Sequence, residues 1–168
     1  MDERKDIITI QSDNYEGGRL AAQHLIDKGC RSLLHFGGVA GKNMPADRRA
    51  DGFRDVCLQK GVSNVILQSD QKDFESLQYQ DHIRKSLEKN PAVDGIFASS
   101  DLIALQVIQV CSQMKIEIPA QMKLIGFDDV GISSMATPAI TTIHQPIREM
   151  SELSIEYIDK KLRGETVP

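Results

Sequence analysis

The sequence predicts an α/β fold built on a doubly wound, mostly parallel β-sheet. Five short apolar or β-branched runs are separated by stretches with helical spacing of apolar residues, and glycine or proline follows most of these stretches. Strands that alternate with helices need crossover connections, which produce parallel sheets. The chain has 168 residues, 40% hydrophobic and 26% charged, which suits one ordinary globular domain or two small lobes.

The predicted elements follow one another as strand and helix. The strands are Ile7–Gln11, Ser32–Phe36, Asn64–Gln68, Asp94–Ala98 and Lys123–Phe127. Helices are expected at about 21–28 and 46–60, where apolar residues recur at intervals of three and four. Two more are expected at about 74–90, which Asn90-Pro91 ends, and at 102–114, which is apolar almost all round. Lys28-Gly29 and Lys60-Gly61 mark helix ends, because a cation in the last turn and a glycine beyond it both favour termination.

The C-terminal part departs from this repeat. Ile140–Ile143 is a sixth short strand, and the loop that reaches it from Phe127 is too short for a crossover helix. We therefore expect it to lie antiparallel at an edge of the sheet, or to cross to another lobe. A final amphipathic helix is predicted at about Ile147–Arg163.

Composition limits the classes of function. The net charge of -4 gives no electrostatic reason for this chain itself to bind nucleic acid or an anionic membrane. The charged start carries no apolar signal core, and no run approaches the length of a membrane span, so a cytoplasmic protein is expected. Three widely spaced cysteines without a CxxC pair predict buried thiols.

Catalytic and metal-binding patterns are missing or incomplete. The Gly37–Asn43 loop resembles a phosphate loop, but Phe36 and Asn43 stand where that motif needs glycine and Ser or Thr. The sequence has no GxSxG elbow and no HxxxH or HxH pair. We expect neither an enzyme nor a metal or cofactor site, although an enzyme such as a sugar hydrolase is an alternative for this fold.

Polar residues follow each predicted strand. These clusters are Ser12-Asp13-Asn14, the loop leading to Arg49, Ser69-Asp70, Ser99-Ser100-Asp101 and Asp128-Asp129. In a parallel sheet they lie along one edge, which is where ligands bind in open α/β sheets. Helix capping is the competing interpretation, favoured for Asn14, Asp70 and Ser99 individually. Loop residues follow Asp128-Asp129, so at least one of these carboxylates is expected to accept hydrogen bonds from ligand hydroxyls.

Four segments together resemble the lactose-repressor/galactose-repressor family of bacterial transcription regulators. They are Ser12–Gly18 leading to His24–Ile26, Arg49–Phe53, Asp94–Asp101 leading to Ala104, and Ile125–Asp129 with Pro138–Ile143. The resemblance implies a two-lobed effector-binding core similar to periplasmic sugar-binding proteins. In that family a separate helix-turn-helix head binds operator DNA, and the effector lies between the lobes.

The resemblance also implies a set of ligand contacts. Arg49 and Asp128 correspond to residues that hydrogen-bond ligand hydroxyls, and Gln145 and Ser12 to further contacts. Ser100 stands where many relatives carry asparagine. Phe74 is the nearest ring to the position at which many relatives place an aromatic platform, and it is equally well explained as an apolar helix residue.

On this basis we expect a fragment of such a regulator that lacks the DNA-binding head. Residues 1–30 would be a remnant of the N-terminal lobe, 31–143 the C-terminal lobe, and 144–168 a crossover with a returning helix. The implied partners are a sugar or related effector, a second copy in a homodimer, and operator DNA only through the missing head. A sugar-binding component of a transporter is the alternative with the same fold.

Overall fold

The computed structural model describes residues 7–39, 44–69 and 75–167, which form two compact units. One unit comprises residues 14–144, and the other combines the described part of residues 1–13 with residues 145–167. Each unit is described separately below.

The larger unit is built on a five-stranded sheet in which every strand pair is parallel. The strands lie in the order β2-β1-β3-β4-β5. Their bounds are β1 Ser32–Val39, β2 Ser63–Ser69, β3 Gly95–Ala98, β4 Lys123–Asp128 and β5 Thr141–His144. The predicted α/β class and doubly wound, mostly parallel sheet are therefore confirmed.

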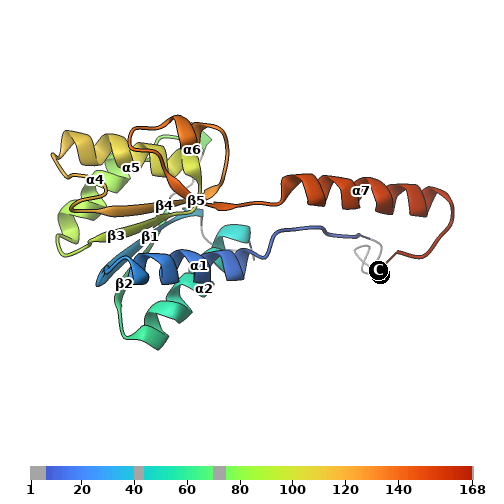
Figure 1. Cartoon of the computed structure of the whole chain (residues 1–168), viewed down its shortest axis with the longest axis horizontal. Coiled ribbons are helices and arrows are strands. Elements are labelled where there is room, and N and C mark those ends of the chain that lie inside the picture. Colours follow the sequence, from blue (N-terminus) through green and yellow to red (C-terminus); the bar gives the residue numbers. More distant parts are fainter. Residues whose placement is uncertain (1–6, 40–43, 70–74, 168) are drawn as a thin grey trace. The chain divides into compact units, whose positions relative to one another are not determined.

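Helices cover both faces of this sheet (Figure 1). On one face lie α1 (Asn14–Asp27) and α2 (Pro45–Lys60), whose apolar residues form a core cluster with Phe97 and Phe127. On the other lie α4 (Gln80–Lys89) and α5 (Asp101–Gln113), which pack on Phe36 and Ile96. The central strands β1, β3 and β4 are mostly buried, which explains why they read as continuous apolar runs, whereas the edge strands β2 and β5 are partly exposed.

The strand β5 corrects one expectation. It lies at the edge of the sheet as one of the alternatives stated, but it runs parallel to β4, with Ile125 opposite Thr141 and Phe127 opposite Ile143. The antiparallel prediction is wrong because residues 129–140, which include the short helix α6 (Ile132–Met135), return the chain to the start of β4. This short connection therefore joins two parallel neighbouring strands, for which a long crossover helix was expected to be necessary.

The smaller unit contains α7 (Ile147–Leu162) and the extended segment 7–13. The predicted strand Ile7–Gln11 is not observed, because no other described segment pairs with its backbone and a strand requires a partner. The predicted boundary near residue 30 also differs from the observed one. The helix α1 packs extensively on α2, so residues 14–30 belong to the larger unit.

Candidate functional site

Close packing of α1 on α2 brings Arg49 to the carboxyl edge of the sheet. A Cβ atom on Gly18 would lie 2.0 Å from the Arg49 carbonyl oxygen, and one on Gly52 would lie 2.0 Å from the Tyr15 carbonyl oxygen. Only glycine permits this distance between the two helix backbones. Gly52 of the Arg49–Phe53 motif therefore lets α2 lie close against α1, which fixes the position of the Arg49 side chain relative to α1.

The guanidinium group of Arg49 is held from three sides. Its Nε donates a hydrogen bond of 2.9 Å to Asn14 Oδ1, and its Nη1 donates to the Ser99 carbonyl oxygen. Its central carbon lies 3.6 Å from the centroid of the Phe127 ring, a cation–π contact. Residues from α1, from the end of β3 and from β4 thus fix one planar, positively charged group.

Electrostatics at this edge couple Arg49 to Asp128. Burial lowers the pKa of Arg49, and the negative charge of Asp128 opposes that shift. Arginine keeps its charge even when it is partly buried. The site thus combines a fixed donor group with a nearby carboxylate, and this pair can bind a ligand that carries neighbouring hydroxyl groups.

The turn after β4 adopts an unusual backbone. Asp128 has a φ of 114° and Asp129 a φ of 57°, both in the region that favours glycine. The N-cap position of α6 is occupied by Gly131, so neither aspartate stands there. Asp129 Oδ2 lies 3.0 Å from His144 Nδ1, and the Asp129 amide donates to Thr142 Oγ1 over 3.3 Å. Successive strained non-glycine residues occur preferentially at functional sites.

Asp101, which follows β3, supports the turn after β4 from below the site. Its side chain is fully buried, and it accepts hydrogen bonds from Thr142 Oγ1 at 2.6 Å and from the Val130 amide at 3.0 Å. A Cβ on Gly126 would lie 2.3 Å from Asp101 Oδ1, so glycine is required beside it. Asp101 thereby connects α5, the turn after β4, and β5.

The remaining sequence predictions fall in different places. Ser100 is the N-cap of α5, because its hydroxyl accepts from the Ile103 amide over 3.3 Å. Capping of α5 therefore belongs to Ser100 and not to Ser99, while Asn14 is the first residue of α1 and its side chain accepts from Arg49. In the smaller unit, Ser12 Oγ donates to Gln145 Oε1 over 2.7 Å. Phe74 and Asp70 lie outside the described residues.

Other kinds of chemistry find little support in the part of the chain that the structure describes. No cluster of three or more histidine, cysteine, aspartate or glutamate side chains with metal-binding proximity occurs in residues 7–39, 44–69 and 75–167. Within these ranges, no helix has the length and hydropathy needed to cross a membrane. Cys30, Cys57 and Cys111 are buried free thiols, and burial raises the pKa of Cys57 and of Cys111 to about 11.

The larger unit is an open parallel sheet with Arg49 and Asp128 at its carboxyl edge, the edge at which α/β domains of this kind bind small molecules. The chain belongs to the periplasmic binding protein-like domain family, whose profile matches residues 22–168. This match covers most of the chain and agrees with the resemblance to lactose-repressor-type regulators seen in the sequence.

Individual relatives agree with this assignment. The chain is 34% identical to the ribose operon repressor of Halalkalibacterium halodurans over 94% of its own length and 46% of the relative. It is 32% identical to the ribose operon repressor of Escherichia coli K12, over 94% of this chain and 48% of that protein. The chain therefore spans about half the length of these curated relatives.

A solved structure supports the fold and the family together. The chain superimposes with a TM-score of 0.82 on a periplasmic binding protein/LacI transcriptional regulator from Alkaliphilus metalliredigens, crystallised with D-xylulofuranose. The two are 32% identical, and the match covers 97% of this chain and 60% of the other. The resemblance to the lactose-repressor/galactose-repressor family is confirmed.

Proposed function

We propose that this chain is the effector-binding part of a bacterial transcription regulator and that its effector is a sugar. The observation that carries the proposal is the fixed Arg49 guanidinium beside Asp128 at the carboxyl edge of the sheet. Sugars present adjacent hydroxyl groups. A guanidinium donates hydrogen bonds to hydroxyl oxygens, and a carboxylate accepts hydrogen bonds from hydroxyl groups. The operon-repressor names of the relatives favour a regulator over a component of a transporter.

Each predicted residue has a proposed part in this binding. Two N–H groups of Arg49 hold Asn14 and Ser99, and its remaining N–H groups would donate to the sugar. Asp128 would accept from adjacent hydroxyls. Ser100, Gln145 and Ser12 would add polar contacts, and Phe74 an aromatic surface, as the family resemblance implies.

The sugar named for the matched Alkaliphilus structure and the ribose repressors among the relatives favour a pentose for this chain. Operator DNA would be bound by a separate domain, because this chain carries a net charge of -4. We further propose cytoplasmic localisation, no enzymatic activity and a homodimer as the working form.

An NMR titration tests the effector, because chemical-shift changes detect weak binding. ¹⁵N-labelled protein is titrated with D-ribose, D-xylulose, sucrose and cellobiose. A pentose should shift the amide signals of residues 99–101 and 128–130, next to the Arg49–Asp128 pair. The proposal also requires that Asp128→Asn abolish these shifts.

Glu88→Gln provides the matched control. Glu88 is an exposed carboxylate on α4, and its neutralisation removes one charge without touching the site. This variant should keep the sugar-induced shifts of the unchanged protein. Shifts that persist in Asp128→Asn, or that map away from the carboxyl edge, would place the sugar elsewhere; no shift with any of the four sugars would exclude them as effectors.

A further inference from the structure

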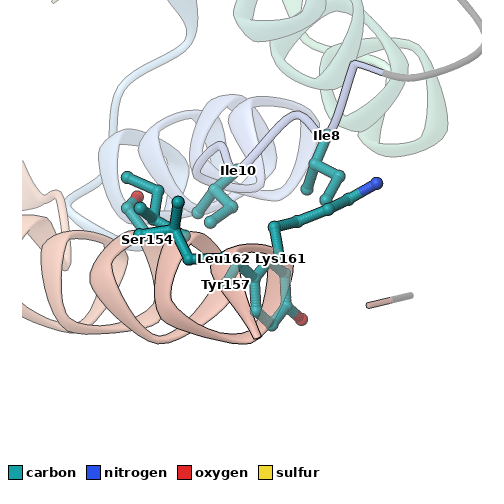
Figure 2. A pocket seen from close by; sticks show the side chains of 7 residues that line it. Ile8, Ile10, Ser154, Tyr157, Lys161 and Leu162 are labelled. Atoms are coloured by element: carbon teal, nitrogen blue, oxygen red, sulfur yellow. The ribbon is translucent and has the colours of Figure 1, made fainter. Parts of the chain in front are cut away.

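A hollow in the smaller unit is poorly suited to a polar ligand. Ile8 and Ile10 of the extended segment and Leu162 of α7 are among the side chains that line it (Figure 2). Its volume is about 540 Å³, and its lining is mainly apolar. A ligand with many hydroxyl groups needs matched donors and acceptors. Groups that can position such a ligand lie instead around Asp128 in the larger unit.

The two backbone amides that follow Asp128 are both held by side chains from other elements. The amide of Asp129 donates to the Thr142 hydroxyl of β5 over 3.3 Å. The amide of Val130 donates to Oδ2 of Asp101, the first residue of α5, over 3.0 Å. The chain is therefore fixed from two sides immediately after the proposed ligand acceptor.

Thr142 and Asp101 form one continuous network. The Thr142 hydroxyl donates to Asp101 Oδ1 over 2.6 Å while its oxygen accepts from the Asp129 amide, so both of its hydrogen-bonding functions are used. Asp101 is fully buried, and each of its carboxylate oxygens accepts a hydrogen bond. A Cβ on Gly126 would lie 2.3 Å from Asp101 Oδ1, so the carboxylate lies directly against the backbone of β4. Buried polar networks whose members are paired are rigid.

This network coincides with the strained part of the backbone. The φ values of 114° at Asp128 and 57° at Asp129 persist only where surrounding contacts impose them. The contact between Asp129 and His144 is a weak restraint, because the two side chains are 46% and 66% exposed. The buried network of Asp101 and Thr142 is therefore the stronger restraint on the turn.

We infer that Asp101 and Thr142 are positioning residues, which hold the turn after β4 in the strained conformation that presents Asp128 at the carboxyl edge of the sheet. Both act through Asp128 and need no contact with the ligand. An acceptor that is ordered in advance binds more tightly, because the entropic cost of ordering it does not fall on the binding step. The inference rests on the proposed function, in which Asp128 accepts hydrogen bonds from the sugar.

The NMR titration measures the effect on binding, with D-ribose or D-xylulose, whichever the unchanged chain binds. Thr142→Val removes the hydroxyl and keeps the β-branched shape, so the strand is preserved. The dissociation constant should rise at least about fivefold, as expected for the loss of one hydrogen bond. Thr142→Ser keeps the hydroxyl and should bind within about twofold of the unchanged chain. An unaltered affinity in Thr142→Val would overturn the inference.

Thr141→Val is the matched control for this titration. Thr141 is the exposed neighbour of Thr142 on the same strand, and successive side chains of a strand point to opposite faces. Its substitution should leave the affinity within about twofold. An equal loss of affinity in Thr141→Val and Thr142→Val would assign the effect to β5 as a whole and contradict a positioning role for the Thr142 hydroxyl.

Urea denaturation supplies a test that needs no sugar. If the network imposes the strain, Asp128→Gly should lower the unfolding equilibrium constant about fivefold in the unchanged chain. In Thr142→Val, where the turn is already relaxed, the same substitution should lower it by less than about twofold. An equal effect in both proteins, of whatever size, would overturn the inference. Unequal effects in a chain that binds none of the sugars would uphold the restraint on the turn and refute the proposed effector.

Discussion

The central carbon of the Arg49 guanidinium lies 3.6 Å from the centroid of the Phe127 ring, so this aromatic side chain supports the basic group whose charge is coupled to that of Asp128. Phe127 is almost fully buried in the core between the sheet and α1 with α2. The contact therefore connects the hydrophobic core directly to the site.

Phe127→Leu should separate core packing from ligand positioning. Loss of the ring should lower the free energy of unfolding by about 1–2 kcal/mol and also weaken sugar binding, because Arg49 loses its support. Phe53→Leu, in the same core cluster but without a contact to the guanidinium, should lower stability similarly and keep the sugar affinity. Urea denaturation and the NMR titration give the two quantities; equal affinity losses in both variants would contradict a special role for Phe127.

Gly18→Ala should disturb the approach of α1 to α2. The added methyl group would lie 2.0 Å from the Arg49 carbonyl oxygen, a backbone atom that cannot move alone. We expect the free energy of unfolding to fall by at least about 2 kcal/mol, because overpacking forces the helices apart. Gly131→Ala is the control, since nothing lies within 4 Å of its Cβ, and its stability should change by less than about 0.5 kcal/mol.

Asp128→Gly should make the fold more stable while removing its proposed activity. The φ of 114° at Asp128 is unfavourable for an L residue and accessible to glycine. Relief of this conformation should raise the free energy of unfolding by about 1 kcal/mol, and the loss of the carboxylate should abolish sugar binding. Denaturation and titration of the same sample measure both. A destabilised variant would show that contacts of the Asp128 carboxylate outweigh the backbone strain.

Stability should fall in weak acid because of His35. This side chain is fully buried, with Nδ1 3.0 Å from the Phe97 carbonyl oxygen, and burial lowers its pKa from 6.5 to about 4. Between pH 6.5 and about pH 4, His35 is therefore protonated in the unfolded chain and neutral in the folded chain. The resulting decrease in the free energy of unfolding is absent well above pH 6.5 and grows as the pH falls toward 4.

This linkage should reduce the free energy of unfolding by about 2 kcal/mol between pH 7 and pH 5, since each pKa unit corresponds to about 1.4 kcal/mol. Urea denaturation of the unchanged chain and of His35→Phe at both pH values measures the His35 contribution by difference. The variant keeps an aromatic ring beside Phe53 and Phe97 but has no group to protonate. An identical pH dependence in both proteins would assign the loss to other groups.

Local patterns in the sequence were sufficient for the main sheet. The apolar runs at 32–36, 64–68, 94–98 and 123–127 all became strands, because their spacing leaves room for helices; the runs in β1, β3 and β4 are also mostly buried, whereas the run in β2, at the edge of the sheet, is only partly buried. Helix ends at Gly29 and Gly61 followed from glycine's access to a positive φ. The pairing of strands that are distant in the sequence could not be predicted from such local patterns. Ile7–Gln11 has the composition of a strand but pairs with no strand among the described residues, and β5 runs parallel to β4.

By itself the sequence determined the fold class, the family and the edge of the sheet at which polar residues gather, because these depend on local periodicity and on motifs that are contiguous in the chain. Only the tertiary structure decided how those polar residues act. It made Ser100 a cap, buried Asp101 as a connection between α5 and β5, and held Arg49 on Phe127. The reason is physical: each of these roles depends on atoms that are distant in sequence and meet only when helices and strands pack together.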